Sequence, residues 1–375
     1  MKKILYFKHI FKSTIKMLLR LMLLFSIKHH KEMVYYSNIN NNYRLKNIPQ
    51  KSHVKRYLDL LFISIVWENA GILYYLQNAD LVNRKVTRDY LPYTEFKRIR
   101  DSKNRTKPYD YICLLQDKLL FERYYNSVGL KVTKSLKEIL PCSETDIFIS
   151  DIKNSLIKHG RDGNFIFFLK PRYGIKGKNS FKLEIKNNDF IINDKIVDKC
   201  QLLDLIKENY ICQHIVEQHH YIKALHPESL NTLRVITYRD NHKKIKVFLA
   251  YLRIGSMGCI TDNNSRSRVI VEMDTKTGKL HEVGVSIEND NLNESYFHNT
   301  TMNYFSKITV PYYYEALQIA IKAHKFTPGI HSIGWDIAIK SDGVELIEGN
   351  DDWGGTSPMG IMNDFKSKYL TMHNE

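Results

Sequence analysis

Cysteine is scarce in this chain of 375 residues, and the five cysteines present are scattered. None of them form a C-x-x-C pair, so the sequence excludes a disulfide framework and a cysteine-based zinc site. A reducing, cytoplasmic compartment fits this usage. The chain also lacks a Gly-x-Ser-x-Gly motif, which argues against a serine hydrolase. With 43% hydrophobic and 26% charged residues, disordered and fibrous classes are excluded as well.

Acidic residues are rare at the N-terminal end. Residues 1–60 contain 13 lysines and arginines but only two acids, Glu32 and Asp59, so they carry most of the net charge of +16. The rest of the chain is close to electrically balanced, whereas a nucleic-acid-binding core is expected to spread positive charge over its folded body. We therefore expect no nucleic-acid partner.

No apolar run is long enough to span a bilayer. The most apolar stretch, residues 17–27, has eleven residues, about half of the roughly twenty that a transmembrane helix needs. A basic helix with an apolar face over residues 4–27 suits an anionic membrane surface, which predicts a peripheral protein on the inner face of the cell membrane. Two alternatives are a helix packed on the protein body and a true membrane or signal anchor. The basic stripe of this helix is formed by Lys8, Lys12, Lys16 and Arg20.

The order of helical and strand patterns indicates three regions. Residues 1–48 combine the basic helix with an Asn-rich linker, residues 49–112 form a helical leader, and residues 113–375 form the main domain. Helical spacing predicts helices over 53–80, 117–128, 199–209 and 311–324, the last with Pro311 in its first turn, and a polar loop over 98–108. The fold class is α+β with largely antiparallel sheets, and the expected strands are 165–170, 181–186, 189–192, 210–215, 232–239, 245–254, 268–274, 332–340 and 344–349.

Two acidic residues are expected to face each other in a hairpin near the C-terminus. Ser341-Asp342-Gly343 is typical of a three-residue turn with glycine in the left-handed position, and that register places Asp336 opposite Glu348. Asn350, two residues further on, shares their face. Two carboxylates and an amide oxygen make the hard, all-oxygen kind of site that Mg²⁺ accepts. The alternative is a solvated hairpin face with ordinary acids.

A basic loop with two glycines follows a predicted buried strand. The strand delivers Lys170, and the loop contains Gly174, Gly177 and Lys178; backbone N–H groups of such a loop can bind phosphate. It is not a P-loop, because Arg172 stands where the first glycine is required. Its position after the lysine strand also excludes a protein kinase. The alternative is an ordinary hairpin turn.

Two arginines, Arg234 and Arg253, lie within apolar strand patterns. Burying an arginine is costly unless it meets an anion, and a guanidinium binds carboxylate or phosphoryl oxygens with two parallel hydrogen bonds. Both arginines are therefore candidates for contact with a phosphoryl group. A structural salt bridge is the alternative for each of them.

In chain order, these motifs resemble the ATP-grasp superfamily, and within it the sugar-transfer-associated ATP-grasp proteins found with polysaccharide synthesis. The resemblance covers residues 113–360, and the run from Ser229 onwards is its most specific part. It is carried by Asp117-Lys118-x-x-Phe121, Phe168-Leu169-Lys170-Pro171, Gln213, Gln218-His219, Ser229-Leu230-Asn231-Thr232-Leu233-Arg234, Leu252-Arg253-Ile254-Gly255, Asp262-Asn263, Gly334-Trp335-Asp336 and Ile347-Glu348-Gly349-Asn350.

The resemblance implies two α+β subdomains that sandwich ATP, preceded by the helical N-terminal region. It implies contacts from Lys118 and Lys170 to the phosphates or the adenine edge, and a hinge near Gln213 that holds the adenine. The residues implied to close over the phosphates are Gly174, Lys176, Gly177 and Lys178.

The resemblance also assigns roles around the reacting groups. Asp336, Glu348 and Asn350 would ligate Mg²⁺, and Arg253 with Arg234 would stabilise charge on the transferring phosphoryl group. Substrate contacts are implied for Asn231, Asp262 and Asn263. Three segments depart from the family pattern on the expected acceptor side, so the resemblance does not extend to the identity of the substrates. They are 264–268, where a glycine pair is usual, 298–302, where a His-Pro-x-Thr-Gly pattern is usual, and 351–353, where a proline-containing loop is usual.

The predicted function is an ATP- and Mg²⁺-dependent ligase that releases ADP and phosphate in surface-polysaccharide assembly. A carboxylate, such as that of an amino acid, would attack the γ-phosphorus of ATP. An amine or hydroxyl of a sugar or peptide-like acceptor would then displace phosphate, which requires positioning and charge stabilisation more than a protein nucleophile. The alternatives are a kinase of an acceptor hydroxyl with the same fold and a non-catalytic, membrane-associated nucleotide-binding scaffold.

Overall fold

The computed structural model describes most of the chain in two compact units. One unit comprises Met1–Lys103, Glu288–Glu294 and Gly354–Glu375, and the other comprises Asn104–Ile287 and Ser295–Trp353. Among the described helices, none combines the length and the hydropathy that crossing a bilayer requires. The predicted boundaries at residues 48 and 112 stay predictions. The described residues are 26–39, 49–67, 71–104, 111–140, 150, 165–174, 177–186, 189–192, 195–255, 268–288, 291–355 and 364–374; the expected basic helix therefore lies almost wholly outside them.

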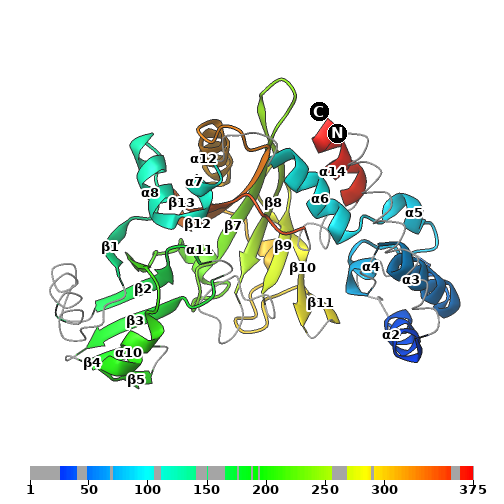
Figure 1. The fold of residues 1–375 in the computed structure, drawn as a ribbon, viewed down its shortest axis with the longest axis horizontal. Helices are drawn as coiled ribbons and strands as arrows, with labels where there is room; N and C mark the ends of the chain where they lie inside the picture. Colours follow the sequence, from blue (N-terminus) through cyan, green and yellow to red (C-terminus); the bar gives the residue numbers. More distant parts are fainter. Residues whose placement is uncertain are drawn as a thin grey trace, which may run out of the picture. The chain divides into compact units, whose positions relative to one another are not determined.

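The first unit is built from helices, whose shared core includes Met33, Leu60 and Ile63 together with three buried tyrosines. The single helix expected over 53–80 is wrong. Gly71 has a φ of +105°, a conformation that no continuous helix contains, and the chain forms a first helix to Trp67 and a second from Ile72. The helices of this unit (Figure 1) are α2 (Ile27–Ser37), α3 (His53–Trp67), α4 (Ile72–Leu76), α5 (Val86–Asp89), α6 (Tyr93–Asn104) and α14 (Phe365–Asn374).

The polar loop expected over 98–108 is wrong in its first half, because α6 continues to Asn104. Arg98 forms an ion pair with Glu95 one turn earlier, with Nη2···Oε1 at 2.5 Å. Arg100 is buried, and its guanidinium lies 5.6 Å from the ring centre of Phe96. Basic residues that look like a solvated loop in the sequence therefore belong to a packed helix.

The second unit contains two antiparallel sheets. The smaller sheet has six strands in the order β1-β6-β2-β3-β4-β5. Along β3, alternate residues are buried, and helix α10 (Lys199–Leu205) contributes Leu202 to the same core. The strands are β1 (Ser135–Ile139), β2 (Phe165–Pro171), β3 (Phe181–Lys186), β4 (Asp189–Ile192), β5 (Lys195–Val197) and β6 (Tyr210–His214).

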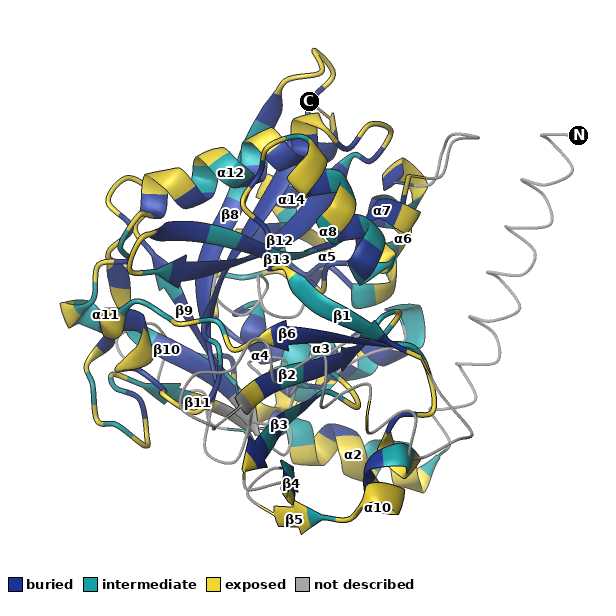
Figure 2. Ribbon diagram, turned by 90° about the vertical axis from the view of Figure 1, so that its left-hand side faces the viewer, coloured by how far each residue is buried: buried dark blue, intermediate teal, exposed yellow. Residues whose placement is uncertain are grey.

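The larger sheet has seven strands in the order β11-β10-β9-β8-β7-β12-β13, and residues 291–294 of β11 are counted with the first unit. Its central strands are buried almost throughout (Figure 2). Helix α12 packs on it through Ala316, Ala320 and Ala323, whose small side chains allow close contact. The strands are β7 (Thr232–Arg239), β8 (Ile245–Ile254), β9 (Val269–Met273), β10 (Leu280–Glu288), β11 (Asn291–Ser295), β12 (Ser332–Lys340) and β13 (Gly343–Asn350).

Short helices frame both sheets. In α8, the Asp117 carboxylate accepts from the backbone N–H groups of Leu119 and Leu120 at 3.0 and 3.1 Å, and Gly129 follows the helix end with φ +76°. Pro311 lies before α12, not in its first turn, because the helix begins after Tyr312. The remaining elements are α7 (Cys113–Gln116), α8 (Lys118–Ser127), α11 (His220–Lys223), α12 (Tyr313–Lys325) and the 3₁₀ turn η2 (Phe305–Lys307).

All nine expected strands are present within one or two residues. Strands β1, β5, β10 and β11 were not expected. Ser-Leu-Lys-Glu-Ile in β1 has too few β-branched and aromatic residues to stand out as a strand, and it is held in place by pairing with β6.

Candidate active site

A cavity of about 440 Å³ lies between the two sheets of the second unit. The smaller sheet contributes residues from β2, β3 and β6 with the loop after β2, and the larger sheet contributes residues from β7, β8, β12 and β13. Six lysine or arginine side chains line it against four acids, so its charge favours an anion. Apolar residues complete the lining and offer a surface for a flat ring; they include Ile166, Phe168, Ile215, Val216, Leu230 and Ile347.

Two carboxyl groups meet at one wall of this cavity. Asp336 on β12 pairs directly with Glu348 on β13, which confirms the register expected from the sequence. The turn is shorter than expected, since Lys340 pairs with Gly343, and a bulge between Asp336 and Ile337 restores the register. Burial raises the pKa of Glu348, and the adjacent Asp336 carboxylate raises it further. Lys118 and Lys170 act in the opposite direction and favour the ionised form of Glu348.

Asp336 is held between the two arginines predicted as candidates. The Arg234 Nε and Nη2 atoms donate to the two carboxylate oxygens at 2.5 and 3.0 Å. The Arg253 Nη1 atom donates to the same oxygens at 3.1 and 3.3 Å. Burial alone would raise the pKa of Asp336, but the two guanidinium groups outweigh it and the pKa falls below the usual value. Both arginines therefore form the structural salt bridge that was the alternative to phosphoryl contact. Of the two, only Arg253 lines the cavity.

Two lysines approach the same wall from the smaller sheet. Lys170, at the end of β2, is 7% exposed, and burial lowers its pKa to about 8 against the opposing effect of Glu348. Lys118 begins α8, and burial lowers its pKa as well. Its ammonium group donates to the backbone oxygen of Gly174. Both lysines line the cavity, where a bound anion would favour their charged form.

The start of the glycine loop is clamped to α8. Arg172 binds the Asp117 carboxylate through Nε and Nη2 at 2.8 and 2.6 Å, and its Nη1 atom donates to Glu138 at 2.7 Å. The Lys118 N–H donates to the Arg172 carbonyl oxygen at 3.2 Å. Main-chain and side-chain bonds therefore fix the base of the loop that carries Gly174, Gly177 and Lys178, all of which line the cavity.

Of the three predicted metal ligands, Asp336 and Glu348 line the cavity, whereas Asn350 contacts Glu348 but is outside the lining. The Asn350 Nδ2 atom lies 3.4 Å from Glu348 Oε1 and also donates to the Gly334 carbonyl oxygen at 3.3 Å. This leaves the Asn350 Oδ1 atom for another partner. Asp336 already has both oxygens bound by guanidinium groups. Oxygen donors of this kind fit Mg²⁺, whereas no group of three or more His, Cys, Asp or Glu in the described residues could hold a metal ion.

Two other predicted residues, Gln213 and Asn231, make structural contacts through their side chains. Gln213 lines the cavity but lies within β6, between β1 and β2, and its side chain donates to Thr133. Ile215 and Glu217, which follow the end of β6 and are not part of the sheet, also line the cavity. Asn231 is fully buried and outside the lining.

The side chain of Asn231 organises the turn before β7. Its Nδ2 atom donates to the carbonyl oxygens of Ile222 and His226 at 3.0 and 2.9 Å, and its Oδ1 atom accepts from the Gly255 N–H at 3.2 Å. These three bonds give Asn231 a structural role, and its substrate contact stays a prediction. Lys176, Asp262 and Asn263 lie outside the described residues, so their roles stay predictions.

Several lining residues were missed from the sequence. Lys182, Glu217, Lys223 and Glu228 line the cavity. Lys182 stands on β3 beside the lysine strand, so strand alternation would have placed it there. Glu217, Lys223 and Glu228 lie between β6 and β7, in a segment without a regular pattern, and no sequence signal identifies them.

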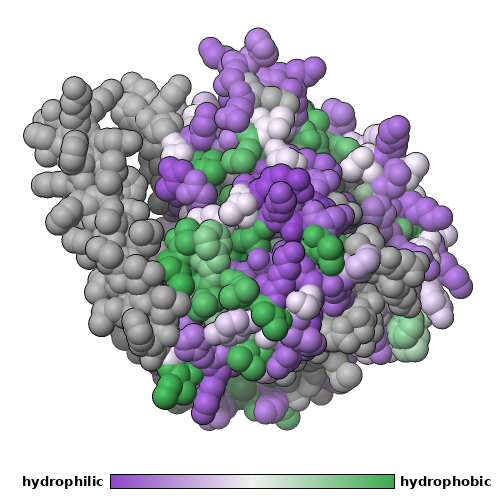
Figure 3. Space-filling view, turned by 90° about the vertical axis from the view of Figure 1, so that its right-hand side faces the viewer, coloured by the Kyte–Doolittle hydropathy of each residue, from purple (hydrophilic) through white to green (hydrophobic). Residues whose placement is uncertain are grey.

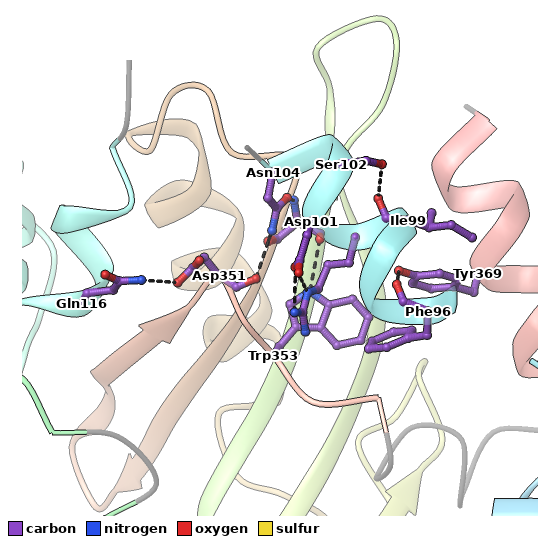
Figure 4. A network of polar contacts seen from close by, with 11 residues as sticks. Phe96, Ile99, Asp101, Ser102, Asn104, Gln116, Asp351, Trp353 and Tyr369 are labelled. Carbon is purple, nitrogen blue, oxygen red and sulfur yellow. Dashed lines mark hydrogen bonds and ion pairs between the residues drawn. The ribbon is translucent and has the colours of Figure 1, made fainter. Parts of the chain in front are cut away.

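The segment that departs from the family pattern after β13 is structural. The Asp351 Oδ1 atom accepts from Gln116 at 3.4 Å, and its carbonyl oxygen accepts from Asn104 at 3.0 Å (Figure 4). Trp353 is buried and donates to Ser332 at 3.1 Å. None of these residues line the cavity. Residues 351 and 353 therefore fix the end of the strand carrying Glu348, and the expectation that this segment faces an acceptor stays a prediction.

Comparison with known proteins agrees with this architecture. The family model described as "Sugar-transfer associated ATP-grasp" matches residues 97–366, most of the chain. The chain belongs to this family. The resemblance and the ATP-grasp fold class inferred from the sequence are thereby confirmed. No curated protein matches this ATP-grasp chain.

Solved structures similar to this ATP-grasp chain include three named enzymes. N5-carboxyaminoimidazole ribonucleotide synthetase from Thermotoga maritima is 15% identical with a TM-score of 0.35, over 70% of this chain and 49% of its own. D-alanyl-alanine synthetase A from Vibrio cholerae is 12% identical with a TM-score of 0.38, over 71% and 62%. L-amino acid ligase from Bacillus licheniformis is 8% identical with a TM-score of 0.36, over 66% and 43%. The chain thus spans about half the length of the first of these proteins.

Proposed function

We propose that this ATP-grasp protein is an ATP- and Mg²⁺-dependent ligase that joins a carboxylate to an amine or hydroxyl and releases ADP and phosphate. The observation that carries the proposal is the cavity wall where the Asp336–Glu348 pair meets Lys118, Lys170 and Arg253. Such a wall combines oxygen donors for a cation with positive groups for phosphate. The polysaccharide context rests only on the family's description.

The nucleotide would be held by both sheets. Its ring would contact the apolar lining near Ile215 and Val216, next to the predicted hinge at Gln213. Lys118 and Lys170 would bind phosphate oxygens, and the loop with Gly177 and Lys178 would cover them. The surplus of basic over acidic lining residues supports a polyanionic ligand of this kind.

The residues present fit a magnesium ion in donor chemistry. Glu348 and Asn350 would hold it, and Asp336 would join them if its arginine contacts rearranged. Bound Mg²⁺ would supply charge neutralisation at the phosphate oxygens. A cation beside Glu348 would favour its ionised form and so oppose the raised pKa of this carboxyl group.

The reaction needs positioning more than covalent help from the protein. An oxygen of the substrate carboxylate would bond to the γ-phosphorus while the bond to the bridging oxygen breaks and ADP leaves. The acceptor amine or hydroxyl would then bond to the acyl carbon, lose its proton and release phosphate. Arg253, with Arg234 behind Asp336, would stabilise charge on the transferring phosphoryl group. Asp262 and Asn263 stay candidates for substrate contact.

The partners proposed are an amino-acid-like carboxylate and a sugar or peptide-like acceptor. A lipid-linked acceptor would lie at the inner face of the cell membrane, where residues 4–27 would bind anionic lipid through their basic stripe. A cytoplasmic location agrees with the scattered cysteines.

The test measures ADP and phosphate release from Mg-ATP with pooled amino acids and a polysaccharide-precursor membrane extract. We expect release of both products to need the extract, and Glu348→Gln to lower the rate by roughly 100-fold or more. Glu345→Gln is the matched control, because Glu345 lies on the same strand but outside the cavity lining. Its Oε2 atom forms an ion pair with Lys340 Nζ at 3.0 Å. ADP without free phosphate would indicate the kinase. ATP binding without turnover in either protein would indicate the scaffold.

A further inference from the structure

Helix α3 has two apolar faces, and only one of them is covered. Leu60 and Ile63 point into the core of the first unit and are fully buried. Val54, Leu58 and Phe62 recur every four residues on another face and are 70%, 56% and 40% exposed. A helix of a globular protein normally presents polar residues on the face away from its core. The second face of α3 therefore needs a partner.

Helix α2 extends the same exposed surface. It runs antiparallel to α3, since His29 contacts Ser64 at 3.0 Å and Ser37 contacts His53 at 3.1 Å. Its buried residue Met33 shares the core with α3. Helical spacing places Ile27 and Val34 together on a face of α2 roughly a third of a turn from Met33, where they are 75% and 48% exposed.

We call this surface the outer face; its residues are Ile27, Val34, Val54, Leu58 and Phe62. Figure 3 views the side of the molecule on which Figure 1 shows α2 and α3, and hydrophobic residues gather there in one area. Singly scattered exposed apolar residues need no explanation, but a continuous area of them marks an interaction site.

The charge around the outer face identifies its partner. Lys28, Lys31 and Lys55 are exposed on the same two helices, as is the acid Glu32. In the sequence, residues 1–25 lead directly into α2 and contain six basic residues and no acid. A second copy of the chain would bring the same positive charge to the contact and be repelled. An anionic lipid surface would attract the lysines and accept the apolar residues.

We propose that the outer face of α2 and α3 lies on an anionic membrane, with its five apolar side chains inserted at the level of the lipid headgroups. This inference rests on the membrane association in the proposed function, but it assigns the contact to a folded surface rather than to residues 4–27. It places the first unit, and not only the N-terminal segment, on the membrane.

The test measures binding of the full chain to vesicles of phosphatidylglycerol and phosphatidylcholine. We expect Leu58→Gln/Phe62→Gln to weaken binding by roughly tenfold or more, since both side chains would leave lipid. The matched control is Ile196→Gln/Leu205→Gln, which changes two exposed residues of the second unit, at 71% and 44% exposure. Thermal unfolding verifies that both variants fold.

A local probe separates the outer face from the N-terminal segment. In Phe62→Trp, brominated lipid should quench the new fluorescence, and in Ile196→Trp it should not. Wild-type affinity of the double variant together with unquenched Phe62→Trp would overturn the inference and leave residues 4–27 as the only contact. A dimer that the double variant converts to monomers would overturn it in favour of a second copy.

Absence of vesicle binding by the wild type would overturn both this inference and the membrane part of the proposed function. ADP release with soluble acceptors tests the ligase reaction without membranes, so the two failures are distinguishable.

Discussion

Replacing Asp117 by asparagine should loosen the glycine loop while leaving α8 intact. Asp117 has two tasks: it caps the helix through two backbone N–H groups, and it binds the Arg172 guanidinium at 2.8 and 2.6 Å. Asparagine caps a helix as well as aspartate does, but it carries no charge for the arginine. Asp117→Ala removes both contacts, so the pair of variants separates the two tasks.

The magnitude follows from the burial of the pair. The side chains of Asp117 and Arg172 are 14% and 21% exposed, so the pair is neither fully exposed nor fully buried. Exposed ion pairs contribute about 0.2–1 kcal/mol to stability, and breaking a buried pair costs about 3–5 kcal/mol. Glu138 still binds Arg172 in the variant. We therefore expect Asp117→Asn to cost about 1–2 kcal/mol of unfolding free energy, and Asp117→Ala about 1 kcal/mol more for the lost cap.

The same loss should appear in nucleotide binding. A loop that is no longer fixed at its base must be ordered when Mg-ATP binds, and 1–2 kcal/mol corresponds to roughly 5- to 30-fold weaker affinity. Urea unfolding and titration calorimetry measure the two quantities. Asp204→Asn is the control, because Asp204 is 81% exposed and its nearest lysine nitrogen is 3.9 Å away.

Acid should abolish the difference between the wild type and Asp117→Asn. Burial raises the pKa of Asp117, but Arg172 and the backbone N–H groups outweigh this effect and lower it. Its ionised form therefore stabilises the protein at neutral pH, and this stabilisation is lost as the pH falls through the lowered pKa. Equal stability and equal Mg-ATP affinity of the two proteins at pH 7 would refute the clamp.

Two further substitutions test the cavity wall. Lys170→Met should weaken ATP binding. Because burial lowers the pKa of Lys170 to about 8, wild-type unfolding free energy should rise by about 3 kcal/mol as the pH increases from about 8 towards 10, and Lys170→Met should lack this rise. Urea unfolding measures the profile, and a rise of the same size in Lys170→Met would contradict this account. Gly349→Ala should lower the free energy of unfolding by about 1–3 kcal/mol, because a Cβ there would lie 2.8 Å from Leu115 and 2.9 Å from Trp335. Thermal unfolding of this variant at the wild-type temperature would contradict this, since it would show that the neighbouring side chains move to accommodate the methyl group.

Local patterns predict the parts of the fold that depend on near neighbours. Asp117 and Gly129 delimit α8 because capping is a property of a few consecutive residues. The strands rich in β-branched and aromatic residues were located to within one or two positions. Failures occur where distant contacts decide. Strand β1 depends on β6, some seventy residues away in the sequence, and α6 continues through basic residues because the first unit buries Arg100.

The contacts around Asp336 show the same limit within the site. Alternation indicated that Arg234 and Arg253 lie in buried strands, but not which anion they meet. That anion is set by strand order: β12 pairs with β7, which places Asp336 beside Arg234, and β7 pairs with β8, which carries Arg253. Spacing favours pairing of consecutive strands such as β7 and β8, but it does not indicate that β12 pairs with β7. The ion pairs follow once the order is known.

The pairing of Asp336 with Glu348 was predicted correctly, but the three-residue turn on which the prediction rested is not present. A three-residue turn would align Asp336 with Glu348 directly, but the structure has a two-residue turn, and Ile347 has no partner in the ladder. A two-residue turn without a bulge would shift β13 by one residue from Asp336 onwards. Since neighbouring residues of a strand face opposite sides, Glu348 would then point away from the cavity. The bulge at Ile347, not the glycine turn, therefore sets the register on which the site depends.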